Sequence, residues 1–129
     1  MENIPGADKV IAWFGAWPSF HDAEVLELHL DRSGRSWIKI HAWNMTDKVD
    51  ATGHFVLDKH AVVTFTLEEV TELELNGFSS QNVIAGLDVE RTSDGFRLAL
   101  HPCYGLTGSI QASRMHVDIA PGKPTAKDK

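Results

Sequence analysis

His21, Asp22 and Glu24 form the densest group of ionisable side chains beside an apolar segment. An imidazole with two carboxylates can carry out acid–base chemistry if a cleft shifts their pKa values, with His54 or His60 as a third group. In the structural alternative, Asp22 caps a turn and His21 donates to backbone where a helix passes into a strand. Adjacent strand residues point to opposite faces, which favours the structural alternative.

The other reactive residue types do not complete a recognisable catalytic or metal motif. On one outer strand face, His29 and His41 can lie near Glu27 and bind a metal weakly, or they can simply form a solvated polar surface. The only cysteine, Cys103, excludes an intramolecular disulfide and a CxxC zinc site. We therefore expect no metal ion and no cofactor.

These residues must be positioned by helices and strands, and the sequence pattern predicts an α+β protein that is mainly β. We expect a short N-terminal helix, because Val10, Ile11 and Phe14 follow helical spacing, and then about seven or eight mostly antiparallel strands. From Glu24 onward the period is two. Leu26, Leu28 and Leu30 alternate with polar residues, as do Ile38, Ile40 and Ala42, and a loop containing Ser33-Gly34 joins the two runs. In this hairpin Leu28 faces Ile38 or Ile40, and Glu27 falls opposite Lys39 or His41.

Further along, residues 45–52 are polar and predict an irregular segment. We expect one long or bulged strand over 55–68, a separate strand over 70–75, and a single helical turn over 79–84. A hairpin of 87–91 with 96–100 and two weaker strands, 106–112 and 114–119, complete the prediction. Residues 1–120 then form a single α+β domain, and residues 121–129 form a disordered C-terminal tail.

The charge balance disfavours nucleic acid as a partner. Twelve Lys and Arg stand against 18 Asp and Glu, which gives a formal net charge of −6. The last nine residues hold three lysines and one aspartate, so the rest of the chain is more acidic still. Such a body repels phosphate backbones and suits a basic partner, although the acids can also serve only solubility. With no apolar stretch of bilayer length and a single cysteine, we expect no membrane contact and a cytoplasmic location.

A resemblance to a known family rests on several segments. They are WPSFHDAEV at 17–25, preceded by WFG at 13–15, then NMTD at 44–47, GFSSQNV at 77–83 and YGLTGS at 104–109. With these, the chain resembles the immunity protein 50 family, small bacterial proteins assigned to polymorphic-toxin systems, from about residue 4 to 119. The resemblance implies a single, mainly β domain in the bacterial cytoplasm that binds and blocks a cognate toxin without catalysis. The motif residues are Trp17, Phe20, His21, Asp22, Glu24, Gln81 and Asn82.

We therefore expect a non-enzymatic, cytoplasmic immunity-type protein that neutralises a cognate, basic toxin through an acidic surface. The acidic side chains expected to bind this partner are Glu27, Asp31, Glu68, Glu69, Glu72 and Glu74. One alternative is a structural or regulatory homodimer, joined through an edge strand or through the face that carries Trp37 and Trp43, unless the N-terminal helix covers that face. The other is a small acid–base or metal-assisted enzyme that uses His21, Asp22 and Glu24. Gln81 and Asn82 either satisfy backbone groups or contact the partner.

Overall fold

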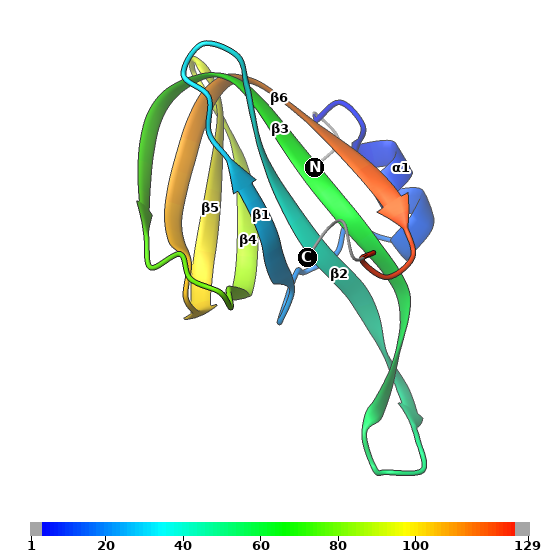
Figure 1. Cartoon of the computed structure of the whole chain (residues 1–129). Coiled ribbons are helices and arrows are strands. Elements are labelled where there is room, and N and C mark those ends of the chain that lie inside the picture. The colour runs from blue at the N-terminus through cyan, green and yellow to red at the C-terminus, as the bar shows by residue number, and fades with distance from the viewer. Residues whose placement is uncertain (1–3, 126–129) are drawn as a thin grey trace.

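The protein is a closed six-stranded barrel with one helix, as seen in a computed structural model that describes residues 4–125 (Figure 1). The helix is α1 (Ala7–Phe14). The strands are β1 (Glu24–His29), β2 (Arg35–Val49), β3 (Phe55–Asn76), β4 (Val83–Thr92), β5 (Gly95–Tyr104) and β6 (Thr107–Pro121). They are joined in the order β1-β2-β3-β6-β5-β4, and all ladders are antiparallel. The expected class, mainly β with one short N-terminal helix, is confirmed.

The expected count of seven or eight strands is wrong, because two pairs of predicted strands are each one continuous strand. In β3 the expected break after Glu68 is a bulge: the register shifts between Val70 and Glu72, and Glu69 has a φ of 55°. Likewise, β6 runs through the two weaker strands that the sequence predicts. A bulge changes the side-chain alternation without ending the ladder, so the sequence pattern breaks where the strand does not.

Two further local predictions are wrong. Residues 45–49 do not belong to an irregular segment but continue β2, and they pair with the start of β3 in a long hairpin that projects from the barrel (Figure 1). Residues 79–82 form no helical turn, and β4 begins at Val83. Of the expected tail, residues 126–129 lie outside the described residues, whereas Pro121 ends β6 and Gly122 donates to the His60 carbonyl at 2.7 Å.

The β1–β2 hairpin has the expected register. Leu28 pairs with Ile38 and Glu27 pairs with Lys39. The inward alternation holds for Ile38 and Ile40 but not for Leu30, which is 48% exposed, because β1 ends at His29. A bulge between Val25 and Glu27 also makes Val25 the buried residue at the start of the strand.

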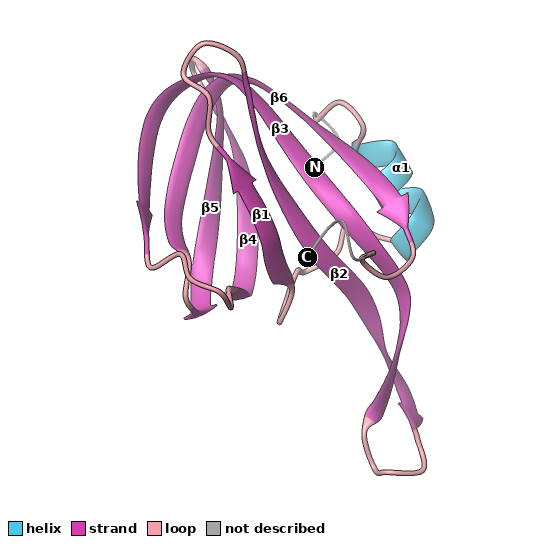
Figure 2. Ribbon diagram, in the orientation of Figure 1, coloured by secondary structure: helices cyan, strands magenta, loops and turns pink. Residues whose placement is uncertain are grey.

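The core fills the barrel interior, and α1 contributes to it. The apolar face of α1, formed by Ala7, Val10 and Phe14, joins the cluster of inward-facing strand residues, and Figure 2 shows this single helix beside the broad part of the sheet. The helix ends at Gly15, whose N–H donates to the Ile11 carbonyl in a left-handed cap. Among residues 4–125, no helix is long and apolar enough to cross a membrane.

Candidate partner-binding surfaces

The segment around residues 20–24 closes the barrel. Only one residue pair, Glu24 with Val83, joins β1 to β4 in the described ladders. Three backbone hydrogen bonds strengthen this seam: Asp22 N–H to the Ile84 carbonyl at 2.9 Å, Ile84 N–H to the Ala23 carbonyl at 3.0 Å, and Val25 N–H to the Asn82 carbonyl at 2.8 Å. The most specific part of the family-like motif therefore holds the two ends of the sheet together.

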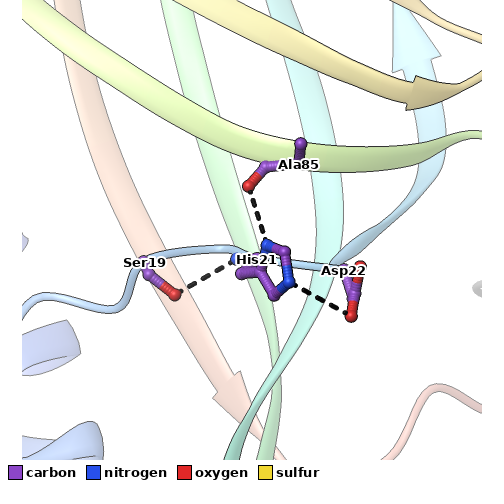
Figure 3. A network of polar contacts seen from close by, with 4 residues as sticks. All are labelled: Ser19, His21, Asp22 and Ala85. Atoms are coloured by element: carbon purple, nitrogen blue, oxygen red, sulfur yellow. Dashed lines mark hydrogen bonds and ion pairs between the residues drawn. The ribbon is translucent and has the colours of Figure 1, made fainter.

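His21 supports the same seam from outside. The Ala85 carbonyl on β4 accepts a hydrogen bond from His21 Nδ1 at 3.2 Å, and the His21 N–H donates to Ser19 Oγ at 3.2 Å (Figure 3). The second ring nitrogen, Nε2, lies 3.5 Å from Asp22 Oδ2. His21 thus donates to backbone at the helix–strand junction, as the structural alternative expects.

The aromatic residues of the motif pack inward. Phe20 is 2% exposed and has a φ of 58°. Its ring lies 5.9 Å from that of Phe65 and 5.8 Å from that of Trp17, and Trp17 also meets Phe65 edge-on at 6.2 Å. Aromatic contacts of this kind, two edge-to-face and one tilted, add to the stability that burial alone gives.

Asn82 is a buried structural residue. Its Nδ2 donates to the Ser79 carbonyl at 2.9 Å, and its Oδ1 accepts from the Ser79 N–H at 2.9 Å and from the Leu106 N–H at 3.2 Å. The side chain is 3% exposed and satisfies backbone groups. Its neighbour Gln81 is exposed.

The residues of the enzyme alternative do not converge. Glu24 lies opposite His41 on β2, whereas His21 contacts Asp22 and β4. His54 sits in the turn between β2 and β3, bonded to Thr52. Between residues 4 and 125, no three His, Cys, Asp or Glu side chains are grouped so that they could hold a metal ion.

His60 joins His41 instead. The His41 Nε2 and His60 Nδ1 atoms lie 3.0 Å apart, and Trp43 meets the His41 ring edge-on at 4.8 Å. Further along β2, Trp37 stacks on His29 with ring centroids 3.9 Å apart, and its indole N–H donates to Glu27. Both tryptophans are half-buried.

The alternative that α1 covers this tryptophan face is wrong. The apolar face of α1 packs into the core cluster that contains Ile38 and Ile40, which point away from Trp37. Outside this cluster, the Trp13 indole N–H of α1 donates to the Lys59 carbonyl of β3 at 3.0 Å. Trp37 stacks on His29 of β1, and Trp43 lies against the rings of His41 on its own strand and His60 on β3.

Three of the six expected partner-binding acids lie among arginines. Arg114 of β6 lies 3.7 Å from Glu68 and 3.3 Å from Glu69. Arg32, in the loop after β1, and Arg35, the first residue of β2, lie beside the same two glutamates. Asp31 serves that loop: hydrogen bonds from the Ser33 backbone N–H and hydroxyl lower the pKa of its carboxyl.

Glu72 and Glu74 lie apart from these arginines. They follow the bulge in β3, and both are exposed. Their ladder partners are the uncharged Gln111 and Ser109, and Gln111 Nε2 is 3.5 Å from Glu72 Oε2. Glu27 lies on β1 and accepts from Trp37. The strongest uncompensated negative charge among the six is therefore at Glu72 and Glu74.

The sequence prediction missed the projecting hairpin, which we call the arm (residues 43–60). Its large apolar side chains are exposed: Met45 57%, Val49 60%, Phe55 54%, Val56 36% and Leu57 37%. The turn is fixed by Asp50, whose carboxyl accepts from the Thr52 hydroxyl and from the Thr52 and His54 N–H groups, and these bonds lower its pKa. The expected strand over 55–68 includes the second strand of the arm, but the polar residues 45–52 concealed its partner, the end of β2.

Comparison with known proteins gave one family. A sequence model described as "Immunity protein 50" matches residues 6–120. No curated protein and no solved structure matched the chain. The matched range contains α1 and β1 to β5, and all of β6 except Pro121.

Proposed function

The chain belongs to the immunity protein 50 family, and from this premise we propose that it is a non-enzymatic protein that binds and neutralises a cognate toxin. The family match carries the proposal, because it spans the helix and nearly the whole barrel rather than one short motif. The expected resemblance to this family is thereby confirmed.

The proposed mode of action is occlusion by a charged surface. With a net charge of −6, the molecule attracts a basic protein and repels nucleic acid. Glu72 and Glu74, whose ladder partners are uncharged, are the main acids of this surface, and Glu27, Asp31, Glu68 and Glu69 extend it. Long-range attraction of this kind speeds the capture of a toxin before it reaches its target.

The proposed compartment is the bacterial cytoplasm, where an immunity protein meets its toxin. The single cysteine, Cys103, is exposed and free, which suits a reducing environment. No metal or cofactor takes part in the proposed function, since binding and occlusion need only a complementary surface.

The test is affinity capture of the full chain from its native bacterium, read by mass spectrometry at low and high salt. The proposal expects one basic protein at near-equal stoichiometry, in an amount that falls as salt rises because screening weakens the attraction. Capture of no stoichiometric protein, or of the chain itself alone, would remove the inhibitor proposal and leave the homodimer.

A further inference from the structure

The arm contributes nothing to the barrel core. None of residues 43–60 is buried, although the flanking residues Ala42 and Ala61 are 2% and 0% exposed. The arm projects well beyond the other hairpins (Figure 2). Folding of the barrel therefore does not explain why this hairpin is long.

Four of the five large apolar side chains exposed on the arm form one stripe; the fifth, Val56, points to the opposite face because it lies between Phe55 and Leu57 in the strand. In the ladder Met45 pairs with Leu57 and Val49 pairs with Phe55, so each pair shares a face, and Phe55 and Leu57 share a face because they are two residues apart. The stripe, Met45, Val49, Phe55 and Leu57, exposes on the order of 400 Å² of apolar surface, a size at which patches on monomers are often functional.

Both edges of the arm are open. The β1 ladder reaches only His41 of β2, and the β6 ladder reaches only Ala61 of β3. Within residues 4–125, no third strand pairs with 43–49 or with 55–59. Helix α1 contacts the arm near its base, where the Trp13 indole bonds the Lys59 carbonyl and the Asn44 amide bonds the Phe14 carbonyl. An isolated two-stranded hairpin is marginally stable in water, so the rest of the arm gains most from a partner that covers its face or extends its edge.

A second copy of the chain fits the arm poorly. Two stripes packed face to face would bury on the order of 800 Å², whereas specific interfaces need about 1,200 Å² or more. Each copy also carries a net charge of −6, so self-association works against repulsion. A groove on a basic partner that encloses the arm from several sides buries more of the arm's surface than a second copy does. A basic partner is also not repelled by the negative charge of this chain.

We propose that the arm inserts into a groove of the toxin and anchors the complex, an inference that rests on the proposed function. The groove has an apolar floor for the stripe and a basic rim. Asp47 and Asp58 flank the stripe and are exposed, as is Lys48, whereas the Lys59 ammonium lies 4.6 Å over the Trp13 ring. With Asp50 in the turn, the arm carries three carboxylates against two ammonium groups. The arm thus sets how slowly the toxin leaves, while the distant acids set how fast it arrives.

The test compares two phenylalanines of equal exposure. Phe55 is 54% exposed on the arm, and Phe78 is 53% exposed in the loop before β4. F55D and F78D are prepared as full chains, and V49D serves as a second arm variant. Binding kinetics are measured against the basic protein recovered by the affinity capture and then purified. Thermal unfolding checks that every variant is folded.

We expect F55D and V49D to dissociate at least about 30-fold faster than wild type, with association nearly unchanged, as for a hot-spot residue. F78D should dissociate like wild type. If the arm variants bind the captured protein as wild type does, the arm inference is wrong while the proposed function stands. If no basic protein is captured, the proposed function fails and the arm inference fails with it. If wild type is a dimer that F55D makes monomeric, the occupant is a second copy and the inference is overturned.

Discussion

Asn82 shows at the residue scale how a motif position serves the fold. The sequence left open whether Asn82 satisfies backbone groups or contacts a partner. The structure answers this, because the buried amide bonds Ser79 and the Leu106 N–H. Its neighbour Gln81 is exposed and remains available to a partner.

Replacement of Asn82 should therefore destabilise the protein without a partner present. N82A leaves the buried Leu106 N–H without its acceptor, and we expect the free energy of unfolding to fall by about 2–3 kcal/mol, as for lost buried hydrogen bonds. Urea denaturation measures this. The matched control Q81A should stay within about 0.5 kcal/mol of wild type. Equal effects of the two substitutions would show that the amide network is not what fixes this loop.

The motif segment from Phe20 to Glu24 also serves the fold. Phe20 and Asp22 have positive φ values of 58° and 63°, and the strain of these conformations is offset by the seam bonds to residues 82–85. These bonds link residues about 60 positions apart. The sequence could suggest that His21 donates to a backbone carbonyl, but it could not indicate that this carbonyl belongs to Ala85 on β4.

At the scale of elements, the docking of α1 depends on Gly6. This residue has a φ of 91°, and a Cβ atom there would lie 1.9 Å from the Val117 carbonyl oxygen on β6. The Val117 N–H in turn donates to the Pro5 carbonyl at 2.9 Å. A side chain at position 6 would therefore push the helix away from the barrel.

We expect G6A to lower the free energy of unfolding by several times as much as G15A. Gly15 has a similar φ of 87°, but nothing lies within 4 Å of its Cβ position, so G15A costs only the backbone strain of about 1 kcal/mol. Thermal or urea unfolding of both variants tests the difference. Similar losses would mean that strain, and not the contact with β6, governs the start of the helix.

Elements with local, regular patterns were predictable from sequence. The β1–β2 hairpin, including the pairing of Glu27 with Lys39, follows from alternation around one loop. The continuity of β3 was not predictable, because the bulge near Glu69 shifts the alternation while long-range pairing with β6 keeps the strand intact. The arm was missed for a related reason: two extra residues on β2 between Met45 and Val49 break its period.

At the scale of the whole molecule, the two proposed contact regions lie at opposite ends of β3. The arm contains the start of the strand at Phe55, and Glu72 and Glu74 lie near its end. Charges interact over about 8 Å at physiological salt, whereas apolar groups interact only when they are in van der Waals contact. This arrangement assigns anchoring to the start of β3 and steering to the residues near its end.

Charge reversal should separate these roles. We expect E72K/E74K to slow association with the captured basic protein about tenfold at low salt and to weaken its salt dependence, with dissociation little changed. The control E90K/D94K makes the same change in net charge on the β4–β5 hairpin and should have a smaller effect. Stopped-flow or surface-based kinetics give both rates. An unchanged rate and salt dependence for E72K/E74K would place the acidic surface elsewhere.

The most direct test of toxin neutralisation is growth. The captured basic protein is expressed in host cells from one inducible promoter, and the full chain is expressed from another. We predict that the captured protein alone arrests growth and that wild-type chain restores it once the two are present in equal amounts. Growth that is unaffected by the captured protein, or arrest that the wild-type chain does not relieve, would contradict the account.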